Sequence, residues 1–177
     1  MPLTKIQSLG ITDGTIVNAD INASAAIAGT KLSGAGKVLQ VVTATDSTNR
    51  TTTSTSFVTG SNALSVSITP SSASNKIFVS VSSSIVNGSG DGFVFATIYR
   101  GATNLGDSTN GMASVNSVPG VTAIRAPLCM TILDSPSSTS ALTYQVYFRS
   151  NNASYTANLN GGNETVKGSI TAFEIAG

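Results

Sequence analysis

The sequence contains no histidine, a single cysteine and only two glutamates among its 177 residues. Without an imidazole, the chain has no Ser-His-Asp triad and no histidine-ligated metal. A lone cysteine provides neither an internal disulfide nor a thiolate zinc site. The apolar neighbours of Cys129 predict that it packs as a small hydrophobic side chain. Because most hydrolytic and redox machinery is missing, we expect neither an enzyme nor a bound cofactor.

Charge is scarce as well. Charged residues form 10% of the chain, against the usual quarter, and the formal net charge is +1. This balance gives no electrostatic reason to bind nucleic acid or an anionic membrane surface. No apolar run approaches the roughly 18 residues that span a bilayer, so membrane insertion is not expected. Hydrophobic residues still make up 40% of the chain, which is enough to build a core.

The first 36 residues form a repetitive segment. Its large aliphatic residues follow one another in steps of five or six, at Ile6, Ile11, Ile16, Ile21, Ile27 and Leu32. A helix would place such residues three or four apart, and a strand two apart. Identical copies wound about a common axis would bury one residue in five, so we interpret residues 1–36 as a short, extended, self-associating stalk. A flexible linker with accidental spacing is the alternative.

From Lys37 onward the pattern is that of β-strands. An apolar run at 38–42 is followed by apolar and polar alternation over 64–68, 77–85, 93–100, 142–149 and 170–175. Turn-forming residues separate these segments. Eight or nine short strands without a convincing helix predict an all-β fold, an antiparallel jelly-roll sandwich, as a head domain over residues 37–177.

The surface of this sandwich is predicted to be uncharged. Several strands are apolar on both faces, and Ser, Thr and Asn number 27, 23 and 14. A monomeric sandwich would cover its outer faces with Lys and Glu, which discourage edge pairing and aggregation. The composition therefore favours a homo-oligomer with large uncharged interfaces.

The segment ITDGTIVNADINASAAIAGTKLSGAG resembles a repeat of tailed-bacteriophage fibre proteins, in which I-x-D-G-x-I-x-N-x-D-I blocks precede a globular head. The stretches KVLQVV, LSVSITPSSASNKIFVSVS, ATIYRGATNLG, TYQVYFRS and GSITAFEIAG look like the heads that follow such repeats. The resemblance implies a homotrimer with a jelly-roll head of the tumour necrosis factor and C1q kind. It also implies a virion protein assembled in the host cytoplasm, held to other virion proteins through residues 1–36 and contacting the host envelope. A capsid or tail decoration protein without a specific receptor is the alternative.

The loops of the head carry the candidate receptor contacts, because loops on a rigid sandwich vary without disturbing its core. Amide side chains and tyrosine rings suit a host-surface glycan, and a protein receptor is the alternative. We select Asn87, Asp91, Asn151, Asn152, Tyr155 and Asn160 as receptor-binding candidates. Ordinary turns, with Asn supplying positive φ, are the alternative interpretation.

Two further sets of charged residues are weaker candidates for sites. The aspartates lack the spacing of a calcium-binding loop, so no metal site is expected; they are Asp91, Asp107 and Asp134. The arginines fit either an anionic polysaccharide or hydrogen bonds at sheet edges and subunit contacts; they are Arg100, Arg125 and Arg149.

Overall fold

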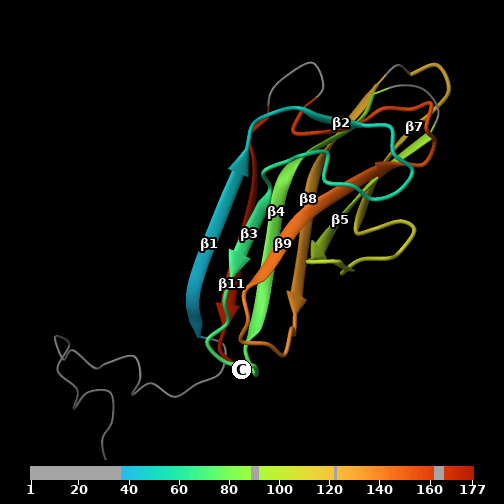
Figure 1. The fold of residues 1–177 in the computed structure, drawn as a ribbon. Coiled ribbons are helices and arrows are strands. Elements are labelled where there is room, and N and C mark those ends of the chain that lie inside the picture. Colours follow the sequence, from blue (N-terminus) through green and yellow to red (C-terminus); the bar gives the residue numbers. More distant parts are fainter. Residues whose placement is uncertain (1–36, 89–91, 122, 162–165) are drawn as a thin grey trace, which may run out of the picture. The chain divides into compact units, whose positions relative to one another are not determined.

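The computed structural model describes residues 37–88, 92–121, 123–161 and 166–177, which form β-strands and turns (Figure 1). The strands are β1 (Val38–Asp46), β2 (Arg50–Thr52), β3 (Ser65–Ile68), β4 (Lys76–Asn87), β5 (Gly92–Arg100), β6 (Thr103–Asn104), β7 (Ala113–Ser117), β8 (Ile124–Asp134), β9 (Leu142–Ser150), β10 (Ala157–Leu159) and β11 (Gly168–Ile175). The predicted stalk residues and one predicted loop residue lie outside the described residues; they are Ile6, Ile11, Ile16, Ile21, Ile27, Leu32 and Asp91.

The strands form two antiparallel sheets. Sheet A contains β1, β11, β4 and β8, with the short strands β2 and β10 paired to each other and β10 also paired to β4. Sheet B contains β3, β9, β5 and β7, with β6 also paired to β5. The eight principal strands pair first with last, second with seventh, third with sixth and fourth with fifth. This nested pairing is that of a jelly roll, so the predicted all-β sandwich is confirmed.

The hydrophobic core lies between the two sheets. Ile77, Val79 and Val81 alternate along β4 with side chains on the opposite face, and each is at most 1% exposed. From sheet B, Val146 and Phe148 are fully buried. Each such side chain contributes roughly 1.5–3 kcal/mol to folding through the surface that it removes from water.

The outer face of sheet A carries a row of apolar side chains across its four principal strands. Val41 of β1 lies opposite Phe173 of β11, Phe173 opposite Phe78 of β4, and Phe78 opposite Leu133 of β8. Val41 is 52% and Leu133 54% exposed, and the two phenylalanine rings lie 5.9 Å apart. We call these four residues the apolar row. Towards the start of β11, the next two rows of the register hold only small uncharged side chains: Thr43, Thr171, Ser80, Thr131, Thr45, Ser169, Ser82 and Cys129.

Cys129 belongs to this outer face and is exposed, which corrects the prediction that it packs in the core. Its neighbours Leu128 and Met130 are buried. Since successive side chains of a strand point to opposite faces, burial of the two neighbours turns the thiol outward. The apolar neighbours of Cys129 in the sequence indicated burial because the strand around it was not among those predicted.

A buried carboxylate joins β11 to β1 and to the turn before β4. Glu174 is 1% exposed, and its Oε1 accepts hydrogen bonds from the Ser71 backbone N–H at 2.6 Å and from the Asn75 amide at 2.5 Å. The Ser71 hydroxyl donates to the same oxygen at 2.7 Å, and Gln40 donates to Oε2 at 2.7 Å. Burial raises the pKa of Glu174, but these hydrogen bonds outweigh it and lower the pKa to about 2.

Candidate functional site

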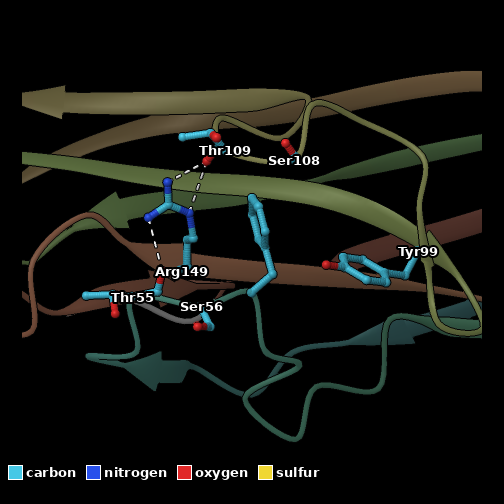
Figure 2. Close-up of a pocket in the computed structure, with 7 residues that line it drawn as sticks. Thr55, Ser56, Tyr99, Ser108, Thr109 and Arg149 are labelled. Carbon is cyan, nitrogen blue, oxygen red and sulfur yellow. Dashed lines mark hydrogen bonds between the residues drawn. The ribbon is translucent and has the colours of Figure 1, made fainter.

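A cavity of about 420 Å³ lies on the outer face of sheet B. Strands β5 and β9 form its floor, and the segments 54–57 and 107–110 form two walls. Figure 2 shows Arg149 between Thr55 on one side and Thr109 on the other, with Tyr99 further along the floor. The lining residues are Thr55, Ser56, Phe57, Tyr99, Ser108, Thr109 and Arg149. We call this cavity the Arg149 pocket.

Aromatic rings continue the pocket along the outer face of sheet B. Phe57 and Tyr99 lie 6.3 Å apart between ring centroids, and Tyr99 stacks on Tyr147 at 4.0 Å. Towards the start of β5, Phe95 and Phe93 stack at 5.7 Å, and Phe93 is 41% exposed. These five rings are half of the ten Phe and Tyr residues of the chain, so this face is enriched in the side chains that dominate recognition surfaces.

The guanidinium of Arg149 lies between two rings and two walls. Its Cζ is 4.5 Å from the ring centroid of Phe95, which is its partner in the strand register, and 5.3 Å from that of Phe57. Its Nη1 donates to the carbonyls of Thr55 at 3.2 Å and Ser150 at 3.1 Å. Its Nε donates to the Thr109 carbonyl at 3.1 Å, and its Nη2 donates to the same oxygen. Burial lowers the pKa of Arg149.

Backbone hydrogen bonds to β9 hold the first wall. Ser150 N–H donates to the Ser54 carbonyl at 2.9 Å, and Val58 and Phe148 exchange two hydrogen bonds of 3.1 and 2.9 Å. The wall segment therefore continues the line of β3 along the edge of sheet B, and this brings Phe57 to the outer face beside Arg149.

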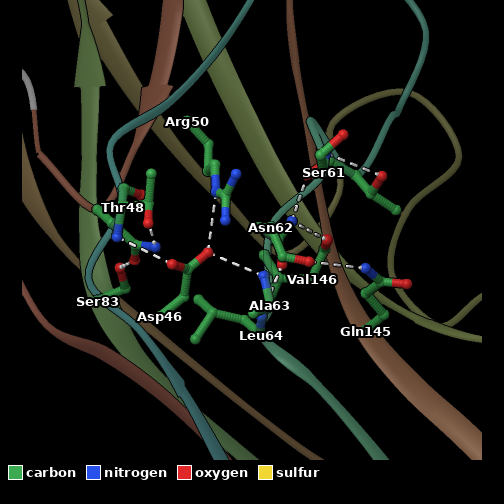
Figure 3. A network of polar contacts seen from close by, with 12 residues as sticks. Asp46, Thr48, Arg50, Ser61, Asn62, Ala63, Leu64, Ser83, Gln145 and Val146 are labelled. Atoms are coloured by element: carbon green, nitrogen blue, oxygen red, sulfur yellow. Dashed lines mark hydrogen bonds and ion pairs between the residues drawn. The ribbon is translucent and has the colours of Figure 1, made fainter.

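A polar network at the end of β1 fixes the same segment from both sides (Figure 3). The carboxylate of Asp46 accepts hydrogen bonds from Thr48 N–H at 2.9 Å, Ala63 N–H at 2.8 Å and Arg50 Nε at 3.1 Å. Burial raises the pKa of Asp46, but these hydrogen bonds and the charge of Arg50 outweigh it and bring the pKa below its usual value. Asn62 adds a hydrogen bond to the Val146 carbonyl at 2.9 Å. The network ties the chain before and after the wall segment to the sandwich.

The second wall is a tight loop between β6 and β7. The Asp107 carboxylate accepts hydrogen bonds from the backbone N–H groups of Thr109 at 3.0 Å and Asn110 at 2.6 Å, which lower its pKa. Gly111 closes the loop at φ 69°, where a Cβ would lie 2.5 Å from the Ala96 carbonyl oxygen. The loop thus presents the Thr109 carbonyl to Arg149 in a fixed position.

The predicted loop residues occupy different environments. Asn87 and Asn160 are fully buried: Asn87 donates to the Gly92 carbonyl at 2.8 Å, and Asn160 accepts from the Ser83 hydroxyl at 2.5 Å. Their side chains therefore stabilise loops instead of facing a receptor, which corrects their selection as surface contacts. Asn160 does have the positive φ, 64°, that the alternative interpretation as a turn residue expected.

The other predicted residues lie near the aromatic face. Asn151 and Asn152 are exposed and Tyr155 is half-buried. Asn151 accepts a hydrogen bond from Phe93 N–H at 2.9 Å, and the Tyr155 ring lies against Gly92. These three residues therefore adjoin the end of the aromatic face at Phe93, not the Arg149 pocket itself.

Arg100, a candidate contact for anionic polysaccharide, is engaged in an internal cluster. Its Nη1 donates to both oxygens of Asp134 at 2.8 and 2.7 Å, and the Tyr144 hydroxyl donates to Asp134 Oδ2 at 2.6 Å. Burial, together with the charge of Asp134, raises the pKa of Tyr144. Within the described ranges, no group of three or more His, Cys, Asp or Glu side chains is placed to hold a metal ion, and no helix is long and apolar enough to cross a membrane.

The pocket was not predicted from the sequence, although the sequence contains part of the pattern that forms it. Phe93, Phe95 and Tyr99 recur on one face of a predicted strand, while Tyr147 and Arg149 share a face of another. Pairing β5 with β9 brings these faces together. Phe57 lies in a Ser/Thr-rich segment without strand alternation, so its place beside Arg149 had no local signal.

Comparison with known proteins finds structural similarity only at a distance. No protein-family model and no curated protein matches the sequence. The fold is similar to a chain in the structure of the infectious bursal disease virus Gx strain, with a TM-score of 0.36 and 13% sequence identity. The similarity covers 78% of this chain and 37% of that one. At this distance it assigns no function.

Proposed function

We propose that this protein is a homotrimeric structural fibre protein of a tailed-bacteriophage virion, whose head adheres to a host-surface glycan through the Arg149 pocket. Residues 1–36 attach it to other virion proteins, as their resemblance to fibre repeats implies. The head binds without catalysing a reaction.

The Arg149 pocket is the observation that carries the adhesive role. It combines half-buried aromatic rings, wall hydroxyls and backbone carbonyls in one concave surface of about 420 Å³, within the size range of small-molecule sites. Aromatic faces pack against the C–H faces of a sugar ring, while carbonyls and hydroxyls exchange hydrogen bonds with its hydroxyl groups. Several weak sites on one particle then act together through their effective concentration.

The apolar row supports the proposal of self-association. It exposes Val41 and Leu133 on a face whose next two register rows, towards the start of β11, hold no charged side chain, whereas Lys76 lies on the other side of the row. Such a face matches another uncharged surface, and a second copy of the chain supplies one. Because the apolar row lies on sheet A and the pocket on sheet B, copies packed through the first leave the second open to a ligand.

Adsorption of the fluorescently labelled full-length protein to bacterial cells and purified envelope polysaccharides tests the adhesive role. We expect the double variant Phe57→Ala/Tyr99→Ala to bind at least about tenfold more weakly than the parent, because it removes both rings of the pocket. The matched control, Phe93→Ala, removes an exposed ring of the same face that does not line the pocket and is expected to bind normally.

The alternative, a decoration protein without a receptor, predicts a different result. Such a protein would bind phage particles that lack it but would adsorb to no cell or polysaccharide. Loss of adsorption in Phe93→Ala, with normal adsorption of the double variant, would instead place the contact at the loop of Asn151, Asn152 and Tyr155.

A further inference from the structure

We propose that the Arg149 pocket takes a sugar residue that carries a carboxylate, with the acid paired to Arg149 and the sugar ring held against Phe57 and Tyr99. This inference rests on the proposed adhesive function and goes further by naming the chemical class of the ligand.

The charge of the pocket is the first reason. Arg149 is the cation among the lining residues, and none of the seven is acidic. Within the described ranges its hydrogen-bond acceptors are backbone carbonyls, whereas Arg50 and Arg100 pair with Asp46 and Asp134. The neighbouring acid Asp107 is occupied by the N–H groups of its own turn. The pocket thus holds a partly desolvated positive charge that an anion can complement.

The hydrogen bonds that Arg149 already makes also favour a carboxylate ligand. A guanidinium has five N–H donors, and four of them are directed at the carbonyls of Thr55, Thr109 and Ser150. These bonds fix the plane of the group and leave one Nη2 donor for a ligand oxygen. One positive charge with one remaining donor matches a carboxylate better than a phosphate, whose second charge would have no partner among the lining residues.

The rings and walls indicate that the acid belongs to a sugar. Phe57, next to the guanidinium, and Tyr99, further along the floor, are tilted by 59° to each other and offer two apolar surfaces to a ligand. Stacking on Tyr147 fixes the position of Tyr99. Hydroxyls of Thr55, Ser56, Ser108 and Thr109 line the cavity as donors and acceptors. A pyranose with a carboxylate presents matching C–H faces, hydroxyls and one negative charge.

The test compares acids with their uncharged esters. Methyl glycosides of glucuronic acid, galacturonic acid and N-acetylneuraminic acid, each alongside its methyl ester, are titrated against the full-length protein and followed by ligand-observed NMR. We expect at least one acid to bind about tenfold or more tightly than its ester, as a charge-assisted hydrogen bond requires. In Arg149→Gln this ratio should fall to about one, while Arg149→Lys, which keeps the charge, should retain part of it.

Arg149 also ties the two walls together, so its replacement can disturb the pocket itself. The ester serves as an internal control, because its affinity should change little in Arg149→Gln if the cavity keeps its shape. Tyr99→Ala supplies a second readout: it should weaken acid and ester alike and leave their ratio unchanged.

The other outcomes separate this inference from the proposed function. Equal binding of acid and ester that Tyr99→Ala weakens would overturn the inference and keep the pocket as a neutral-sugar site. Failure of all three acids, while the protein still adsorbs to cells through Phe57 and Tyr99, would overturn the inference alone. Absence of both sugar binding and adsorption would overturn the proposed function with it.

Discussion

A single residue, Glu174, shows how this sandwich stabilises a buried charged side chain. Its carboxylate accepts four hydrogen bonds from Ser71, Asn75 and Gln40, and all four donors are neutral groups. Together they hold the carboxylate in its charged form at a position that is 1% exposed. A glutamine amide at the same place would direct its N–H groups towards donors, and a donor that faces another donor has no acceptor.

We expect Glu174→Gln to lower the free energy of unfolding by about 3 kcal/mol at pH 7, because it leaves buried donors without an acceptor. The pKa of Glu174 is about 2 in the folded protein and 4.5 ordinarily. Its stabilisation is therefore complete above pH 4.5 and is lost as the pH falls from 4.5 towards 2.

Urea unfolding of the parent and of Glu174→Gln at several pH values measures this contribution. The two curves should converge as the pH falls, whereas Lys76→Gln, an exposed charge change, should follow the parent throughout. An equal loss of stability at pH 2.5 and pH 7 would show that Glu174 acts through packing and not through its charge.

At the scale of an element, Gly111 sets the shape of the loop that forms the second wall. Its φ is 69°, and a Cβ at this position would lie 2.5 Å from the Ala96 carbonyl oxygen, so the loop excludes a side chain here. We expect Gly111→Ala to lower the free energy of unfolding by roughly 1 to 3 kcal/mol. It should also weaken ligand binding, since Thr109 would shift relative to Arg149.

Gly101→Ala is the matched control for this prediction. Gly101 has a similar φ of 55° but no atom within 4 Å of a Cβ position. It should lose only the roughly 1 kcal/mol of the left-handed conformation and bind ligand normally. Equal effects of the two substitutions would mean that backbone conformation, and not the contact with Ala96, decides the behaviour of the loop.

The strands that were predicted correctly are those with strong alternation. The runs 64–68, 77–85, 93–100, 142–149 and 170–175 correspond to β3, β4, β5, β9 and β11. The long strand β8 was missed because Pro127 interrupts the strand pattern in its sequence, and a proline there is tolerated because β8 pairs with β4 alone in the described sheet. The apolar and polar alternation therefore located these strands in the sequence, but it did not indicate which strand each of them pairs with.

The candidate site could be predicted only from knowledge of which strands pair with one another. The pocket residues come from three distant parts of the sequence, at Phe57, at Tyr99 with Thr109, and at Arg149. The register of β5 with β9 and the attachment of the wall segment to β9 bring them together. The asparagine-rich loops looked more promising in the sequence. However, the sequence does not distinguish an asparagine that caps or closes a turn from an asparagine that contacts a ligand.

At the scale of the whole molecule, the two outer faces have different predicted partners. If the apolar row is covered by other copies of the chain, charge placed on it should separate them. We expect the full-length parent to have a mass of three chains, about 53 kDa from 17.8 kDa each, by light scattering. Val41→Asp/Leu133→Asp should shift this mass towards one chain, because burying unpaired carboxylates is costly.

Thr143→Asp, at an exposed position of β9 in sheet B, is the control and should leave the mass unchanged. A parent with the mass of a single chain would contradict the trimer. A double variant that keeps the mass of three chains would show that the trimer is held elsewhere, by the stalk of residues 1–36 or by another face of the head.

The nested pairing of strands also governs how fast this head reaches its final form. The partners β5 and β7 are close in sequence, but each further pair encloses the one before it, up to Val38 opposite Ile175. Such long-range pairing makes folding slow, on the scale of milliseconds to seconds. During synthesis, β1 emerges early and remains without its partner until β11 has left the ribosome. Because these strands carry few charges, which would discourage edge pairing, the unpaired edge of β1 is open to association with other nascent chains until β11 pairs with it.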